Sequence, residues 1–201
     1  MAGMLESRPS LSIELQMMTD CHALDDAVAA LRQGGILAYP TEAVWGLGCD
    51  PDNAEALAAL IRLKQRDPAK GLILIAGHIA QLEPWLAGLQ AQDRQRLAAS
   101  WPGPNTWLVP DNGRSHPLLR GEHSSVALRV SDHPLVGELC AAFGGPVVST
   151  SANSAGESPA RDAVTVRRQF GEAVHVLDGS LGGYSRPSTI RDLRSGLVLR
   201  D

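Results

Sequence analysis

The sequence predicts an α/β domain built around a mixed β-sheet, and three observations support this. Short apolar runs alternate along the chain with segments whose apolar residues recur every three or four positions, which is typical of α/β proteins. The run LILIA (72–76) is apolar throughout, as in strands that are covered on both faces. The last two apolar runs lie too close together for a helical crossover, so we expect an antiparallel hairpin that turns near residues 194–196.

The predicted elements follow in a regular order. The first helix ends at the glycine pair 34–35, and Asn53 is a suitable N-cap for the second. Further helices are expected within 79–99, 134–143 and 160–170. The expected strands are ILAY (36–39), LILIA (72–76), TWLVP (106–110), VALRV (126–130), PVVST (146–150), AVHVL (173–177), STIRDL (188–193) and GLVLR (196–200).

Length and composition are those of an ordinary globular protein. The chain has 201 residues, of which 44% are hydrophobic and 20% charged, and its formal net charge is -4. Apolar residues are sparse at the start, so we expect residues 1–18 to be a flexible N-terminal extension and residues 19–201 to form one domain. The mild acidity argues against a protein that coats nucleic acid, although it is compatible with a local basic face.

Cysteine usage and the lack of long apolar runs indicate a cytoplasmic protein. The three cysteines are far apart and form no CxxC pair, so we expect neither a disulfide framework nor a structural zinc site. No apolar run approaches membrane-spanning length, and the start of the chain lacks the basic and apolar regions of a signal peptide. We therefore expect no membrane partner.

Several common catalytic motifs are missing from the sequence. There is no GxxxxGK[ST] loop, no GxSxG elbow and no HExxH, and WGLGCDP lacks the third glycine of a dinucleotide fingerprint. The six histidines are scattered. Covalent catalysis and zinc catalysis therefore have no support, and any nucleotide must be held without a P-loop.

The segment YPTEAVWGLG (39–48) is the first of three that could share a site at the strand ends. Pro40 ends a predicted strand, Thr41 and Glu42 are the first side chains beyond it, and two glycines permit a close approach of the backbone. A turn that packs Trp45 explains the segment about as well.

The segment RLKQRDPAKG (62–71) places four cations beside one acid in an acidic protein. The Asp-Pro pair at 67–68 disfavours helical geometry, so the helix should unwind close to Arg66. Arg66 can then converge with Lys64 and Lys70 on an anion, although residues two apart on a helix do not face each other. A favourable interaction with the helix dipole explains two of these cations, but it does not explain Lys70.

The third segment, STSANSAGESPARD (149–162), places hydroxyl groups and an amide directly after a strand. Such groups bind phosphate oxygens, sugar hydroxyls or a carboxylate. A capped loop that leads into the next helix is the simpler alternative. Arg129, at the end of VALRV, is a candidate for gripping a carboxylate through two hydrogen bonds, and the alternative is a salt bridge to Asp132 or another acid on the same edge.

Six segments occur here in the order and spacing of the YrdC-like family, namely YPTEAVWGLG, LKQRDPAKGLILIA, WPGPNTW, VALRVSDHPL, STSANSAG and PSTIRDL. The chain resembles this family over about residues 20–201, and it looks most like the bacterial single-domain members. The resemblance implies an open, twisted, mixed sheet flanked by helices, with a large, concave, basic face.

The resemblance also implies an activity. Members of the family are nucleotidyltransferases that make threonylcarbamoyl-AMP from L-threonine, bicarbonate or CO2, and ATP, and release pyrophosphate. ATP would be a substrate whose phosphates carry Mg²⁺, and no metal site of the protein's own is expected. Partner proteins would then transfer the threonylcarbamoyl group to tRNAs that read codons beginning with A, beside the anticodon.

The family's motifs place its functional residues on this chain. The KxR motif falls on Lys64 and Arg66, which we expect to serve catalysis, and the SxN motif falls on Ser151 and Asn153. Glu42 could act as a base, but a role in capping explains its presence equally well. The expected ATP-binding residues are Lys64, Arg66, Lys70, Ser125, Ser151, Asn153 and Arg200. The expected threonine-binding residues are Thr41, Arg129, Ser149 and Ser188.

A rival hypothesis is a non-catalytic protein that binds double-stranded RNA or acts in ribosome maturation. In that case the concave face would hold RNA phosphates through counterion release. Aromatic residues for base stacking are few, at two Phe, two Tyr and four Trp, so the sequence favours the enzyme. Binding of double-stranded RNA or tRNA on the concave face is compatible with either function.

Overall fold

The computed structural model describes residues 11–200, with side chains from residue 22 onward. Short 3₁₀ turns η1 (Pro68–Lys70), η2 (Ile79–Leu82) and η3 (Gly171–Ala173) lie among the longer elements. The α-helices are α1 (Leu11–Arg32), α2 (Ala54–Leu63), α3 (Glu83–Leu86), α4 (Ala91–Ala98), α5 (Pro117–Arg120), α6 (Pro134–Phe143) and α7 (Ala163–Phe170). The strands are β1 (Leu37–Pro40), β2 (Trp45–Gly48), β3 (Ile73–Ala76), β4 (Asn105–Pro110), β5 (Ser125–Val130), β6 (Val147–Ser151), β7 (His175–Val176), β8 (Thr189–Asp192) and β9 (Val198–Arg200).

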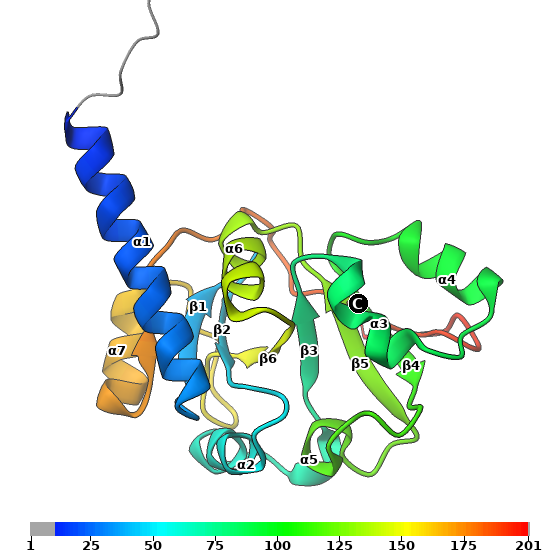
Figure 1. Cartoon of the computed structure of the whole chain (residues 1–201). Coiled ribbons are helices and arrows are strands. Elements are labelled where there is room, and N and C mark those ends of the chain that lie inside the picture. Colours follow the sequence, from blue (N-terminus) through cyan, green and yellow to red (C-terminus); the bar gives the residue numbers. More distant parts are fainter. Residues whose placement is uncertain (1–10, 201) are drawn as a thin grey trace, which may run out of the picture.

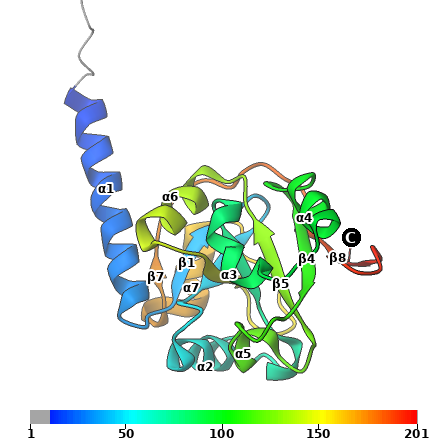
Figure 2. The same ribbon diagram turned by 45° about the vertical axis from the view of Figure 1, so that its right-hand side comes forward.

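The strands form one open, mixed sheet of nine strands in the order β7-β1-β2-β6-β3-β5-β4-β8-β9 (Figure 1). The pairs β1/β7, β3/β5 and β4/β8 are parallel, and the other neighbouring pairs are antiparallel. Helices flank this sheet in both ribbon views (Figures 1 and 2). The predicted α/β class with an open mixed sheet is confirmed.

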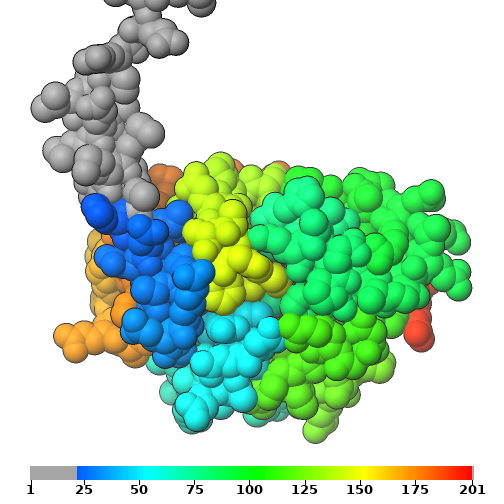
Figure 3. Space-filling model, viewed as in Figure 1, coloured from blue at the N-terminus to red at the C-terminus, as the bar shows by residue number. Residues whose placement is uncertain are grey.

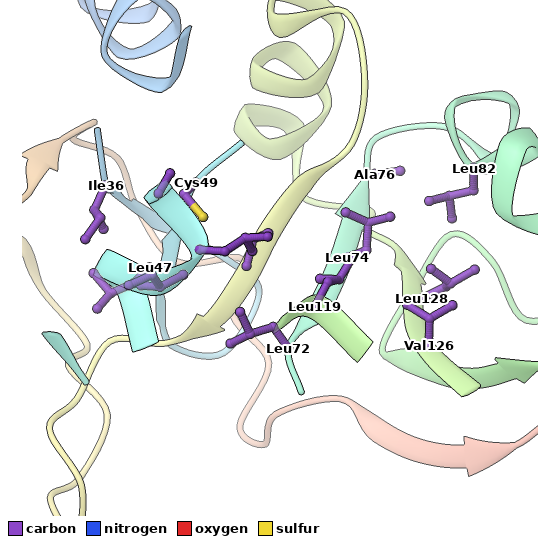
Figure 4. Packing of buried hydrophobic residues seen from close by; sticks show 14 of the residues in the cluster. Ile36, Leu47, Cys49, Leu72, Leu74, Ala76, Leu82, Leu119, Val126 and Leu128 are labelled. Carbon is purple, nitrogen blue, oxygen red and sulfur yellow. The ribbon is translucent and has the colours of Figure 1, made fainter. Parts of the chain in front are cut away.

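One face of the sheet packs against the larger of two apolar cores. Leu47, Leu74 and Leu128 point into this core from three different strands, and all three are fully buried. Leu119 of α5 and Leu82 of η2 close it from outside the sheet (Figure 4). Because neighbouring residues of a strand point to opposite faces, these strands present their intervening residues to the other side of the sheet.

The other face of the sheet is covered by α1 and α6 toward the β1 end only. Leu37, Ile75 and Val147 form a second, smaller core there with Val28 of α1 and Val136 of α6. The space-filling view shows α1, in blue, packed against α6, in yellow-green (Figure 3). Beyond these helices the same face carries polar strand residues and opens into a cavity.

The expected N-terminal extension over residues 1–18 overlaps the first helix, because α1 begins at Leu11. Residues 1–10 lie outside the described part of the chain. The first turns of α1 project beyond the rest of the molecule (Figures 1 and 2). The second half of the helix contributes Ala27, Val28 and Leu31 to the smaller core. Flexibility of residues 1–18 stays a prediction.

Strand β2 is not predicted by the sequence, because its residues also fit a turn. It pairs antiparallel with β1 and β6. Trp45 and Leu47 point into the larger core, while Gly46 and Gly48 leave the opposite face bare, so the usual alternation is too short to recognise. A Cβ at Gly48 would lie 2.2 Å from the Val148 carbonyl oxygen. This glycine therefore allows a close approach to a neighbouring strand rather than to a ligand.

The C-terminal hairpin is confirmed. Strands β8 and β9 are antiparallel, and the Asp192 Oδ1 accepts a hydrogen bond from the Ser195 backbone N–H at 2.7 Å. Gly196 adopts φ +73, a conformation that few residues other than glycine take. The hairpin thus turns where the sequence predicted it, and it places β9 at the edge of the sheet.

Candidate active site

A cavity of about 430 Å³ opens on the uncovered part of the sheet face. Its walls come from the β1–β2 turn, the segment between α2 and β3, strands β3 to β6 and the C-terminal hairpin. Among the described residues that line it, six are Arg or Lys, and Glu42 is the one carboxylate. Such an excess of cations around a concave site attracts anions. The six cations are Arg66, Lys70, Arg120, Arg129, Arg186 and Arg200.

A second cavity of about 250 Å³ adjoins the first and shares Arg66, Lys70 and Ser151 with it. Every site residue expected from the sequence lines one of the two. Lys64 and Asn153 line the smaller cavity only. The larger cavity alone is lined by Thr41, Ser125, Arg129, Ser149, Ser188 and Arg200.

Lys64, Arg66 and Lys70 form a basic corner between the two cavities, and the end of α2 determines how they are placed. The helix ends at Leu63, three residues before the position that the sequence suggested. The Gln65 N–H donates to the Arg62 carbonyl and the Arg66 N–H donates to the Ile61 carbonyl, each at 3.0 Å. This is the Schellman pattern of a helix C-terminus, in which glycine usually occupies the left-handed position. Here Gln65 occupies it, with φ 51, and the reversal turns Arg66 back toward Lys64 and Lys70.

Lys64 is almost fully buried, with 5% of its surface exposed. Its Nζ donates to the Ser151 carbonyl at 2.5 Å, to the Asn153 carbonyl at 2.8 Å and to the Asn153 Oδ1 at 3.3 Å. Burial, assisted by the charge of Arg66, lowers the pKa of Lys64 to about 8. The ammonium therefore holds together the turn that carries the SxN motif, and all three of its N–H groups are engaged there.

Arg66 and Lys70 lie beside this turn and face both cavities. The Arg66 Nε donates to the Gly71 carbonyl at 3.0 Å, and burial lowers the pKa of its guanidinium against the opposing effect of Asp67. Lys70 ends the 3₁₀ turn η1, which Asp67 caps through the Ala69 N–H at 3.0 Å. The remaining guanidinium N–H groups and the ammonium are suited to phosphate oxygens.

The end of α5 and the loop that follows it complete the basic corner, and the sequence did not identify their residues as part of the site. Arg120 and His123 line the larger cavity, and the Arg120 Nη1 donates to the His123 carbonyl. The Leu72 N–H donates to the Leu119 carbonyl at 2.8 Å, and this bond holds α5 and its loop against the basic segment 62–71. No family motif covers Arg120 or His123, so their only sequence signal was a charged, glycine-containing loop.

The opposite end of the larger cavity centres on Arg129 and Glu42. The Arg129 Nη2 lies 2.7 Å from the Glu42 Oε1, and both side chains are buried. The Arg129 Nε donates to the Gly103 carbonyl at 3.2 Å. The sequence had left open a salt bridge from Arg129 to Asp132 or another acid, and the structure shows that the partner is Glu42. The other guanidinium N–H groups are left for an anion.

The Ser188 hydroxyl lines the cavity next to Arg129, and Thr106, the β4 partner of Arg129, supports it without lining the cavity. The Thr106 and Ser188 hydroxyls are 2.7 Å apart and buried, and the Arg200 Nη2 donates to the Ser188 carbonyl at 2.9 Å. Burial lowers the pKa of Arg200, and the charges of Arg129 and Arg66 lower it further. Cations that destabilise one another in this way are expected where an anion binds.

The described residues contain no group of three or more His, Cys, Asp and Glu side chains that could hold a metal ion. Across the same part of the chain, no helix has both the length and the apolar character needed to span a membrane.

The family model for Sua5, YciO and YrdC proteins, described as telomere recombination, matches residues 29–201. The chain therefore belongs to the Sua5/YciO/YrdC family. Within it, the chain is similar to proteins named threonylcarbamoyl-AMP synthase. The protein from Chromohalobacter salexigens is 74% identical over 92% of this chain and 100% of its own length. The protein from Saccharophagus degradans is 53% identical over 88% of this chain and 93% of its own length.

Solved structures show the same fold. P. abyssi Sua5 complexed with L-threonine has a TM-score of 0.79 and 25% identity, with 86% of this chain matched. The match covers 51% of the P. abyssi chain, so this chain spans about half its length. E. coli YciO has a TM-score of 0.79 at 22% identity, with 90% of this chain and 89% of the other covered, and supports the fold alone.

Proposed function

We propose that the chain is a threonylcarbamoyl-AMP synthase, a nucleotidyltransferase that uses L-threonine and ATP. The observation that carries this proposal is a pair of adjoining cavities with two different anion-binding ends. One end has the ion-paired Arg129 beside buried hydroxyl groups, as suits an amino-acid carboxylate. The other has Arg66, Lys70 and the SxN turn, as suits a polyphosphate.

The distance between the two ends fits an amino acid joined to a nucleotide. Ser125 and Arg129 both line the cavity and lie four residues apart on β5, which corresponds to about 13 Å along a strand. Between them the floor is made of small or aliphatic side chains. We therefore place threonine near Thr41, Arg129, Ser149 and Ser188, and ATP near Lys64, Arg66, Lys70, Ser125, Ser151, Asn153 and Arg200.

The residues present suit a reaction without an enzyme nucleophile. The threonine amine would add to bicarbonate or CO2 to give a carbamate, and a carbamate oxygen would attack the α-phosphate of ATP as pyrophosphate leaves. The chain's own task is to hold the reactants close together and to neutralise the charge that develops on the phosphates. Arg66 and Lys70 are placed for the second task. Lys64 would act indirectly, by holding the Ser151–Asn153 turn in position.

Mg²⁺ would enter this site with ATP. The larger cavity's carboxylate, Glu42, is paired with Arg129, and Asp67 of the smaller cavity caps η1 through the Ala69 N–H, so the two cavities offer few carboxylate ligands of their own. Phosphate oxygens and water can supply the octahedral coordination that Mg²⁺ prefers. When bound, the ion would neutralise part of the triphosphate charge.

The proposed function also implies what happens to the product after the reaction. The product would pass, in the cytoplasm, to proteins that transfer the threonylcarbamoyl group to tRNA. The relatives named above are enzymes, which favours this function over a non-catalytic RNA-binding role. Binding of double-stranded RNA or tRNA on the basic face stays a prediction.

The proposal is tested by measuring pyrophosphate release with threonine, bicarbonate and ATP, each omitted in turn. We expect release to require all three substrates and the product to be threonylcarbamoyl-AMP by mass spectrometry. Release that continues unchanged without threonine would show that the chain hydrolyses ATP and is not this synthase.

A further inference from the structure

Glu42 is a buried carboxylate of which only one oxygen is satisfied. It lies in the turn between β1 and β2, is 2% exposed and lines the larger cavity. Its Oε1 accepts from the Arg129 Nη2 at 2.7 Å, the Ser131 hydroxyl at 2.7 Å and the Asp132 N–H at 3.2 Å. Its Oε2 is buried and has no hydrogen-bond partner among the described residues. A carboxylate oxygen left in this state is costly, so a donor is missing.

The side chains around Glu42 do not supply that donor. The Arg129 Nε donates to the Gly103 carbonyl. The His133 Nε2 is 2.9 Å from the Ser180 carbonyl and therefore donates there, and the ring's Nδ1 makes no hydrogen bond to Glu42. This Nδ1 is also buried without a partner among the residues described. The Glu42 Oε2 is therefore an acceptor without a donor, and it can receive a ligand group that donates hydrogen bonds.

We propose that the Glu42 Oε2 accepts a hydrogen bond from the α-amine of the amino-acid substrate while Arg129 holds its carboxylate. This assignment rests on the proposed function and deepens it. Glu42 is the one acid among the described residues of a cavity with six cations, so an ammonium group finds its favourable partner there and is repelled elsewhere. The paired Glu42 and Arg129 carry opposite charges, as do the two ends of an amino-acid zwitterion.

This arrangement makes Glu42 a determinant of substrate specificity. A ligand that lacks the amine leaves the buried oxygen without a donor, and sites of this kind reject such ligands strongly. A suitable probe is (R)-3-hydroxybutyrate, which keeps the carboxylate, the hydroxyl and the methyl group of threonine and replaces the amine with hydrogen.

The experiment is a calorimetric titration of the intact chain with L-threonine and with (R)-3-hydroxybutyrate, without ATP. We expect the wild-type protein to bind threonine about tenfold more tightly or better, as a hydrogen bond to a charged group implies. Glu42→Gln replaces an acceptor with an N–H donor of the same shape. We expect it to weaken threonine binding about tenfold or more and to change hydroxybutyrate binding less than about threefold.

A matched control is Glu83→Gln, since Glu83 also pairs with an arginine, Arg94, at 2.9 Å but on the surface. It should leave both affinities unchanged. The proposal is overturned if the wild-type protein binds both ligands equally, a measurement that does not depend on any variant folding. It is also overturned if Glu42→Gln weakens both ligands to the same extent, because Glu42 would then only position Arg129.

These results are distinguishable from failure of the proposed function. A protein that releases pyrophosphate with threonine but does not discriminate between the two ligands overturns the amine contact alone. A protein that discriminates between them but makes no adenylate overturns the synthase function and leaves the contact standing.

Discussion

At the scale of single residues, the Lys64 ammonium is a buried charge that is held by carbonyl oxygens rather than by a carboxylate. The three oxygens belong to the two residues of the SxN motif. Hydrogen bonds to a charged group favour the charged form, but desolvation is the larger effect here and lowers the pKa to about 8. The KxR and SxN motifs are thus joined to each other even without a nucleotide.

This lowered pKa predicts a specific dependence of stability on pH. The ordinary lysine pKa is 10.5 and the folded value is about 8, so between these values the folded chain binds fewer protons than the unfolded chain. The free energy of unfolding should therefore rise with pH across that interval. Lys64→Met should remove this contribution. The measurement is urea unfolding of both proteins, without ligand, at several pH values from 7.5 to about 10.

The free energy of unfolding of the wild-type protein, relative to that of the variant, should therefore increase as pH rises. A difference that stays constant would mean that Lys64 keeps its ordinary pKa in the folded chain. Bound ATP should instead raise the pKa of Lys64, because its phosphates favour the charged ammonium. The affinity of the wild-type protein for ATP should therefore fall above pH 8.

At the scale of elements, the basic segment after α2 and the loop after α5 are joined through two glycines. A Cβ at Gly121 would lie 2.3 Å from the Ala69 carbonyl oxygen, and one at Gly71 would lie 2.7 Å from the Arg120 carbonyl oxygen. The Glu122 N–H also donates to the Ala69 carbonyl at 3.1 Å. The backbones therefore touch directly, and this contact sets the position of Arg66 and Lys70 relative to Arg120.

Gly121→Ala should break this contact, and Gly113→Ala provides a matched control. Both glycines have positive φ, +69 and +89, but a Cβ at Gly113 would meet nothing within 4 Å. Alanine at Gly113 should cost about 1 kcal/mol for its backbone conformation alone. Alanine at Gly121 should cost about 1–3 kcal/mol more through overpacking, and it should also weaken ATP binding. Denaturation and ATP titration measure both effects, and equal losses in the two variants would contradict the proposed contact.

The same elements show what the sequence could and could not predict. Buried strands such as β3 and the hairpin of β8 and β9 were predicted, because continuous apolar runs and close spacing are local signals. Strand β2 was missed, because its glycines hide the alternation. The end of α2 was placed too late, since a left-handed Gln65 is fixed by packing and not by its own preference. Likewise, the pairing of Glu42 with Arg129 joins residues 87 positions apart along the chain, and no local pattern predicts it.

At the scale of the whole molecule, the two faces of the sheet have different roles, one in stability and the other mainly in binding. One face is committed to the larger core, and the smaller core occupies only the β1 end of the other. The rest of that second face is free to carry charged and hydroxyl groups. The cavity collects residues from Thr41 to Arg200, nearly the whole length of the described chain.

The last strand shows this separation most clearly, because it belongs to the site but not to the core. Leu197, Val198 and Leu199 are 64%, 49% and 58% exposed, and neither core cluster includes a residue after Leu193. Leu199 and Arg200 nevertheless line the larger cavity. Binding and stability should therefore respond very differently to changes in β9.

Deletion of residues 197–201 should leave a folded protein that binds ATP poorly. We expect the free energy of unfolding to fall by about 1–2 kcal/mol, from the lost strand hydrogen bonds, and ATP affinity to fall about tenfold or more with the loss of Arg200. Arg200→Ala should show most of the same loss of affinity with nearly full stability. Urea unfolding and ATP titration of both proteins separate the effects. A deleted chain that fails to fold would place β9 in the structural core, and one that binds ATP normally would exclude Arg200 from the nucleotide site.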